Sequence, residues 1–215
     1  MRNAIVVAAI AAGLLLGGAA GAAETETAAE SPNVLGLGVK GGVGLPQIGS
    51  ELDTSFQVKL ETFYLLPVLG SRLGLVTSAG YSQPEAAGSG SDERLPGGSY
   101  SWEMTQRQTT WDIGVMGRLQ PWSSDWNIGL SAGFELLFLS TLTDGEADGE
   151  PFGEHDERAT LPGVFAAVTG EYRLGPGALF AELAFSATFQ DLTTTGDLTA
   201  SALAILLGYR VGFAL

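Results

Sequence analysis

The segment Leu-Gly-Tyr-Arg-Val-Gly-Phe-Ala-Leu, residues 207–215, alternates large apolar side chains with small or charged ones. The apolar members are Leu207, Tyr209, Val211, Phe213 and Leu215. Successive side chains of a β-strand point to opposite faces, so a two-residue period marks a strand whose two faces differ. This segment therefore predicts a strand with one apolar face and one face that is small or polar.

The same period recurs upstream and predicts further strands of similar character. Each is long enough to cross a bilayer at the tilt of a barrel strand, which takes about 9–11 residues. With the last one, the expected strands cover residues 34–43, 55–66, 73–82, 109–120, 126–139, 161–174, 178–188 and 200–215.

The connections between these strands alternate strictly between short and long. The short ones are residues 67–72, 121–125 and 175–177, and the long ones are 44–54, 83–108, 140–160 and 189–199. Tight turns at one end and long loops at the other are typical of outer-membrane barrels. We expect the long segments to be loops, with the Gly- and Ser-rich residues 84–99 of low complexity.

Alternation alone fits a soluble barrel as well as a membrane barrel, and the composition of the polar face separates the two. Beside Gly, Ala, Ser and Thr it carries equal numbers of cations and carboxylates. A narrow interior favours such a balance, because each buried charge needs an opposite partner. The ten charged residues are Lys40, Lys59, Arg118, Arg173 and Arg210 with Glu61, Asp112, Glu135, Glu171 and Glu182.

The order of the strands suggests how these charges pair across the lumen. We expect Glu135 to pair with Arg118, and Glu182 with Arg173 and Arg210. The side chains of an eight-stranded barrel are large enough to fill it. The network should therefore plug the barrel.

The first 23 residues have the features of a secretory signal peptide. Arg2 precedes an apolar run, and Ala20-Gly21-Ala22 forms a small-residue cleavage site. We expect residues 24–32 to be a short acidic disordered leader and residues 33–215 to be the barrel domain. After residue 23 no run of 18 apolar residues predicts a membrane-spanning helix, and the chain has no cysteine for a disulfide or thiolate site.

The export signal, the loop asymmetry and the terminal strand together resemble the small eight-stranded bacterial outer-membrane β-barrels of the OmpA/OmpX kind. The resemblance implies an all-β fold, a closed antiparallel up-and-down transmembrane barrel. It also implies a monomer in the outer membrane of a Gram-negative envelope, in contact with lipid and lipopolysaccharide, with both termini periplasmic. In that family the last strand, here Leu207, Tyr209, Val211, Phe213 and Leu215, is read by the barrel assembly machinery.

Acidic residues outside the strands give the chain its net charge of −14. The spacing of Asp144, Glu146, Asp148 and Glu150 faintly matches an oxygen-ligand loop but lacks the full twelve-residue calcium pattern. We favour a solvated acidic loop that meets a surface partner, with a divalent-cation site as the alternative. The shortage of clustered cations argues against nucleic acid as a partner.

Catalysis finds little support in the sequence. The single histidine, His155, lies between two acidic residues in a long connection, and no second histidine is present to complete a triad. We expect a non-enzymatic protein without cofactor, with a structural or interaction role in displaying acidic loops. The alternative is a narrow cation-preferring pore for small solutes.

Overall fold

The computed structural model describes residues 33–46, 52–91, 98–147, 149–151, 154–192 and 198–215. The expected signal peptide, the leader and Asp148 lie outside these residues. The described regular structure is β throughout, apart from one short 3-10 turn, η1 (Val68–Gly70). Within the described residues, no helix has the length and apolar character needed to cross a membrane.

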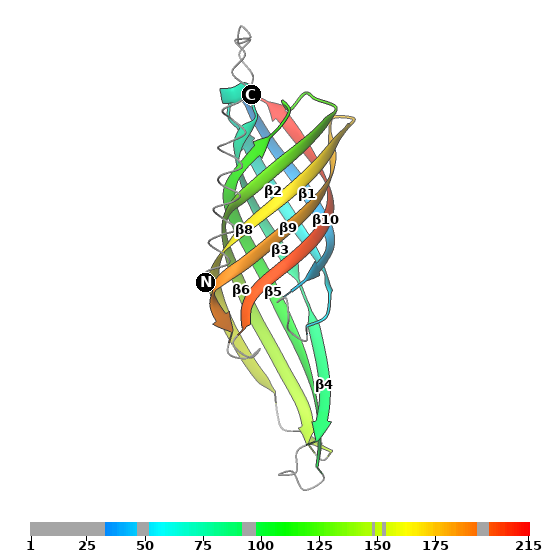
Figure 1. Cartoon of the computed structure of the whole chain (residues 1–215). Coiled ribbons are helices and arrows are strands. Elements are labelled where there is room, and N and C mark those ends of the chain that lie inside the picture. Colours follow the sequence, from blue (N-terminus) through cyan, green and yellow to red (C-terminus); the bar gives the residue numbers. More distant parts are fainter. Residues whose placement is uncertain (1–32, 47–51, 92–97, 148, 152–153, 193–197) are drawn as a thin grey trace.

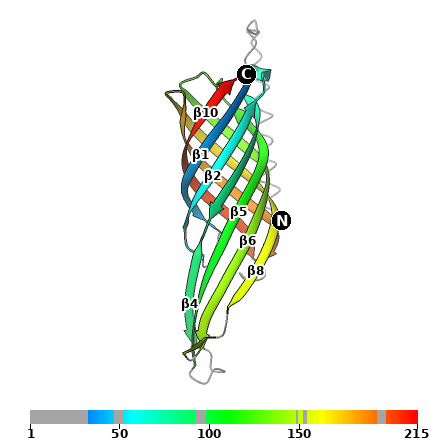
Figure 2. The same ribbon diagram turned by 180° about the vertical axis from the view of Figure 1, so that it is seen from behind.

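Eight of the strands form a closed antiparallel ring in the order β5-β3-β2-β1-β10-β9-β8-β6, and pairing of β5 with β6 completes it. Figures 1 and 2 show the tilted strands from opposite sides. The ring consists of β1 (Val34–Leu45), β2 (Ser55–Leu65), β3 (Leu73–Ser82), β5 (Ser99–Arg118), β6 (Trp126–Ala147), β8 (His155–Leu174), β9 (Gly177–Leu192) and β10 (Leu198–Ala214). The predicted all-β barrel is confirmed.

The terminal strand closes the ring. β10 pairs with β1 in one continuous register from Val34–Ala214 to Leu45–Leu203, and the Leu215 amide donates to the Asn33 carbonyl at 2.9 Å. The C-terminus lies at the same end of the barrel as the short connections, here called the tight-turn end (Figure 1).

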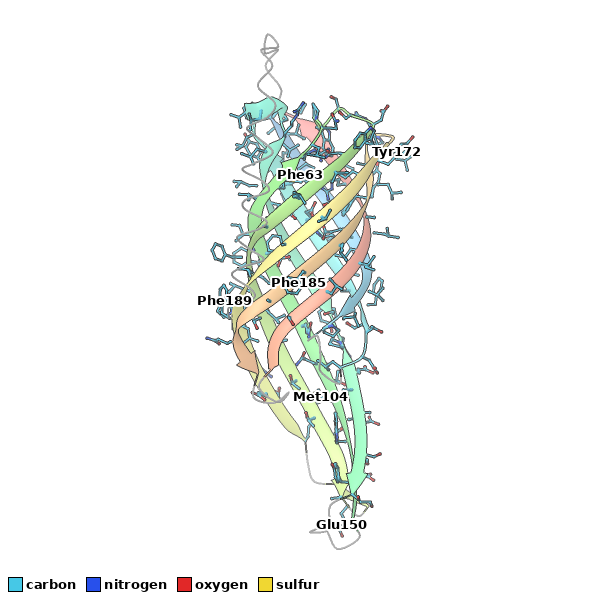
Figure 3. All side chains as sticks on the ribbon, viewed as in Figure 1. Phe63, Met104, Glu150, Tyr172, Phe185 and Phe189 are labelled. Carbon is cyan, nitrogen blue, oxygen red and sulfur yellow. The ribbon has the colours of Figure 1, made fainter. Side chains whose placement is uncertain are left out.

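Apolar side chains cover the outside of the barrel, and polar ones face the inside. Leu60, Phe134 and Leu207 are each more than 60% exposed, whereas Glu61, Glu135 and Arg210 are at most 5% exposed. Figure 3 shows side chains such as those of Tyr172 and Phe189 projecting from the wall. An apolar outer surface of this extent needs lipid around it.

The expectation that residues 83–108 and 140–160 are loops was wrong. They contain β4 (Glu85–Ser91), β7 (Glu150–Pro151) and long extensions of β5, β6 and β8. We define the arm as β4 and β7 with residues 99–108, 140–147 and 155–160. The arm projects from the barrel opposite the tight-turn end, with Glu150 near its tip (Figures 1 and 3).

Glycines that suggest low complexity in the sequence have a packing role in the arm. A Cβ at Gly88 would lie 2.7 Å from the ring of Trp102, and one at Gly90 would lie 2.5 Å from Tyr100. The aromatic rings of β5 therefore rest on the glycines of β4. β4 pairs with the distant strand β5 but has no alternation of large apolar and polar side chains of its own. The sequence therefore predicted a loop.

Candidate functional site

The lumen holds nine of the ten charged residues that the alternation assigns to the inner face. All nine are at most 9% exposed, and Arg210 is only 1% exposed. They come from seven strands of the ring, so the folded barrel alone brings them together. The cations are Lys40, Lys59, Arg118 and Arg210, and the carboxylates are Glu61, Asp112, Glu135, Glu171 and Glu182.

A chain of ion pairs crosses the middle of the lumen. Lys40 Nζ lies 3.0 Å from Glu61 Oε2 and 2.7 Å from Glu182 Oε1. Arg210 lies 3.4 Å from Glu61 Oε1 and 3.4 Å from Glu171 Oε1. Glu61, Glu171 and Glu182 thus each have a cation partner, which offsets part of the large cost of burying charge.

Arg118 extends this chain toward the tight-turn end. Its guanidinium donates to both oxygens of Glu171, at 3.1 and 2.8 Å. Since Glu171 also accepts from Arg210, the carboxylate joins strands β5, β8 and β10 across the barrel.

Aromatic rings surround the guanidinium groups and fill the tight-turn end. The central carbon of Arg210 lies 4.0 Å from the ring centroid of Phe180, and that of Arg118 lies 4.9 Å from the ring of Trp122. Trp122 also packs against Phe63 at a centroid separation of 5.3 Å. Cation–π contacts of this kind gain strength away from water.

Sequence reasoning missed part of this plug. The buried group Val34, Phe63, Leu65, Val76 and Met116 lies within the barrel, and Trp122 packs against it. The position of Trp122 near the inner end of a strand suggests an interfacial aromatic residue, whereas the structure places it against this buried group. Large apolar residues on the otherwise polar face, such as Phe63 and Phe180, were the signal that could have revealed the plug.

A second polar cluster lies nearer the arm. Lys59 Nζ lies 2.9 Å from Asp112 Oδ2, and Ser78 Oγ donates to the same oxygen at 2.6 Å. Glu135 stands directly opposite Asp112 in the β5–β6 register. The two carboxyl groups therefore share one site with a single lysine.

A cavity of about 70 Å³ opens beside this cluster, lined among others by Lys59, Asp112, Glu135, Glu182 and Ser186. It reaches toward the arm as far as Gln108 and Ser55. Its size is enough for a few water molecules, each of which needs roughly 10–15 Å³ measured in this way. The lumen is thus filled by side chains at the tight-turn end and wider toward the arm.

The expected charge pairs were wrong. Glu182 pairs with Lys40, and Arg210 pairs with Glu61 and Glu171 instead of Glu182. Arg118 stands opposite Gly129, whereas Glu135 stands opposite Asp112, so the two do not meet. Arg173 is exposed and donates to the Trp122 carbonyl at 3.4 Å, so it does not belong to the buried network. Barrel strands are staggered against one another, and distance from a turn in the sequence does not give height in the barrel.

The arm gathers carboxylates on one face of its sheet. Glu103 of β5 stands directly opposite Asp144 of β6, and Glu146 stands opposite Ser101, two residues further along the same face. Glu85 of β4, opposite Thr105, extends the same face. Like charges placed opposite each other destabilise a sheet, so a partner that neutralises them gains energy.

The weak metal candidates do not form a centre in the described part of the chain. No group of three acidic, histidine or cysteine residues there is placed to hold a metal ion. Asp144, Glu146 and Glu150 lie in β6 and β7, and Asp148 lies outside the described residues.

Comparison with solved structures finds the same architecture in a major outer membrane protein from Thermus thermophilus. The match has a TM-score of 0.56 and 17% identity, and it covers 83% of this chain and 99% of that one. The chain has the fold of a small outer-membrane β-barrel. No protein-family model matches it, and no curated protein matches it either.

Two other small outer-membrane barrels align over most of the chain with lower scores. OprG from Pseudomonas aeruginosa has a TM-score of 0.48 and 11% identity, and the match covers 86% of this chain and 98% of that one. Ail of Yersinia pestis has a TM-score of 0.44 and 12% identity, with 84% and 99% covered.

Proposed function

We propose that the chain is a non-enzymatic protein of the bacterial outer membrane whose barrel anchors an acidic β-sheet arm at the cell surface. The observation that carries this proposal is the β5–β6 ladder, which runs unbroken from Arg118–Gly129 beside the tight turn to Tyr100–Ala147 in the arm. Along one continuous sheet, the apolar outer face of the barrel gives way to the charged face of the arm.

The same contrast supports one orientation of the barrel in the membrane. The arm is strongly charged and faces the outside of the cell, where lipopolysaccharide surrounds the barrel. The tight turns and both chain ends face the periplasm, the side from which the barrel assembly machinery receives the chain. The ring has no open edge within the membrane, which suits a monomer.

The acidic face favours a cationic partner. Glu85, Glu103, Asp144 and Glu146 share this face with only a few basic side chains. One of these, Arg158, is 79% exposed on its side chain and pairs with Asp156 at 3.1 Å. An exposed pair of this kind contributes little energy, so most of the negative potential remains available to a partner.

The alternative function is a narrow cation-preferring pore. The cavity beside Asp112 and Glu135 and its carboxylate lining favour it. The ion pairs of Arg210 and Arg118 and the ring of Trp122 oppose it, because they occupy the remaining length of the lumen. Bilayer recordings separate the two functions: the anchor predicts no steady conductance from the refolded wild-type protein, and the pore predicts cation-selective steps.

Cysteine labelling tests the location and orientation, because the native chain has no cysteine. We expect Glu103→Cys to react with a membrane-impermeant maleimide on intact cells. The matched variant Ser123→Cys, in the turn before β6, should react only after the envelope is opened. Labelling of Ser123→Cys alone on intact cells would reverse the orientation, and recovery of the protein in the soluble periplasmic fraction would refute the membrane location.

Binding of a fluorescent oligolysine to the protein in nanodiscs tests the interaction surface. Wild-type protein should bind it in a salt-sensitive manner, and the triple variant Glu103→Gln/Asp144→Asn/Glu146→Gln should bind it more weakly. The matched variant Glu135→Gln, changed inside the lumen, should bind like wild type. Equal binding by the triple variant and wild type would contradict the proposed role of this face.

A further inference from the structure

The buried charges of the lumen do not balance. Among the charged residues that are buried in the described part of the chain, there are four cations and five carboxylates. With every group in its ordinary ionised form, the lumen would carry one uncompensated negative charge. An isolated charge in a site shielded from water costs many kcal/mol, so in practice a group neutralises or recruits a counter-ion.

The uncompensated negative charge belongs to the pair Asp112 and Glu135. The other three carboxylates, Glu61, Glu171 and Glu182, are held by Lys40, Arg118 and Arg210. Among the described cations, only Lys59 lies within ion-pair distance of Asp112, and it contacts Oδ2 alone. Asp112 and Glu135 are each 3% exposed and directly opposed on neighbouring strands.

The geometry leaves one acceptor unused at this point. Asp112 Oδ2 receives hydrogen bonds from Lys59 and Ser78, whereas Asp112 Oδ1 is buried with no hydrogen-bond donor among the described groups. Glu135 stands directly opposite Asp112 in the β5–β6 register, and the two residues line the same cavity. Two carboxylates are both acceptors, so a hydrogen bond between them requires a proton.

Polar and charged side chains of β1, β2, β3 and β9 surround the Asp112–Glu135 pair. Ser186 of β9 lines the same cavity as Glu135, Ser78 of β3 donates to Asp112, and Lys59 reaches in from β2. Lys40 of β1 and Glu182 of β9 face the same cavity but bind each other. Arg173 is too far away to compensate Glu135. Glu135 pairs with Gly163 of β8, and Arg173 lies ten residues further along that strand, roughly 33 Å from Gly163.

We propose that Asp112 and Glu135 form a proton-binding site in the lumen, with one proton held by the Glu135 carboxyl and hydrogen-bonded to Asp112 Oδ1. This proton brings the buried charges to four of each sign. Two carboxylates that share a site do not both ionise readily, because each disfavours the charged form of the other. The cavity toward the arm supplies the water through which the proton exchanges.

A proton fits the site better than a metal ion does. Calcium takes six to eight oxygen ligands, and the described residues offer no group of three acidic, histidine or cysteine side chains placed to hold a metal. The ammonium group of Lys59 already occupies one side of Asp112 and would repel a second cation. A monovalent cation in place of the proton is the outcome that the test must separate.

Infrared spectroscopy of the refolded full-length protein in D₂O tests this assignment. At neutral pH, wild-type protein should show the C=O stretch of a protonated carboxyl group. Glu135→Gln should lose that band, and Asp112→Asn should lose it too, because Glu135 then ionises beside Lys59. The matched variant Glu103→Gln, on an exposed part of the same β5–β6 pair, should keep it.

The site is refuted if wild-type protein lacks the band at neutral pH. A band that vanishes when sodium or potassium is added would equally overturn it, because a cation rather than a proton would then complete the charge balance.

Denaturant unfolding against pH gives a second, independent readout. Over the range where the folded state holds this proton and the unfolded chain has lost it, the folded state binds more protons, so stability falls as pH rises. Glu135→Gln should remove this one-proton slope, and Glu103→Gln should keep it. An unchanged slope in Glu135→Gln would contradict the proposal even if the infrared band were assigned differently.

Discussion

Arg210 lies over the ring of Phe180 with its guanidinium carbon 4.0 Å from the ring centroid, while its nitrogens reach Glu61 and Glu171. A planar guanidinium can stack and pair at the same time, whereas the compact ammonium of lysine cannot. Since Phe180 and Arg210 come from the adjacent strands β9 and β10, this contact joins the apolar filling of the barrel to its ion-pair chain. Arg210 therefore belongs both to the aromatic contacts and to the ion-pair chain of the lumen.

Arg210→Ala should destabilise the barrel by about 3–5 kcal/mol, because it leaves Glu61 and Glu171 with one cation fewer in a buried site. The matched change Arg158→Ala removes an exposed arginine from the arm and should cost less than about 1 kcal/mol. Urea unfolding of both variants in micelles measures the difference. Equal midpoints would mean that the lumen charges face open water, and the pore function would gain support.

Gly114→Ala should be destabilising by roughly 1–3 kcal/mol through overpacking. A Cβ at Gly114 would lie 2.3 Å from the carbonyl oxygen of Ala132, a backbone atom that cannot move aside cheaply. Gly170→Ala is the control, because a Cβ there meets nothing within 4 Å. Thermal unfolding, followed by the gel shift between unheated and boiled samples, compares the two. A Gly114→Ala midpoint equal to that of Gly170→Ala would show that the strands adjust freely.

Deletion of residues 207–215 should abolish assembly into the membrane. It removes the β10 partners of Val34–Gly41, and backbone groups left unpaired in hydrocarbon cost several kcal/mol each. Membrane fractionation and immunoblotting measure the result. Replacing Leu207, Tyr209, Val211, Phe213 and Leu215 together by serine tests the assembly signal, because it keeps the chain length. Normal membrane levels of that variant would refute a signal carried by these side chains.

Glu103→Gln/Asp144→Asn should stabilise the arm by about 0.2–1 kcal/mol, because it removes a like-charge pair from directly opposed positions. Slower amide hydrogen exchange in residues 100–106 would report the gain. High salt should slow exchange in wild-type protein in the same direction and have little effect in the variant. Faster exchange in the variant would show that these carboxylates hold the arm together through another contact.

The barrel wall was predictable from the sequence because a two-residue period records which face of a strand meets lipid. β3 (Leu73–Ser82) begins and ends at the predicted residues, and β10 begins within two residues of the expected position. The arm was not predictable in this way. β4 consists of Glu, Ala, Gly and Ser, and its strand character comes from pairing with β5 rather than from any apolar face of its own.

The composition of the lumen was also predictable, but its pairing was not. Alternation assigns Glu135 and Arg210 to the inside, since each lies between outward-facing apolar neighbours. Which charges meet depends on the stagger between strands, set by the full register of the ring. The opposition of Asp112 and Glu135, from which the proton site follows, appears only once that register is known.

The unbroken β5–β6 ladder also determines how the arm bears mechanical load. β5 is bound to β3 from Gln108 to Gly117, and β6 is bound to β8 from Trp126 to Thr143. Hydrogen bonds in antiparallel sheets run across the strands, so a pull on the tip along the strand direction loads many of them side by side. A force from an attached partner would thus be distributed over the strands of the barrel wall. The arm would transmit this force rigidly, unlike a flexible linker.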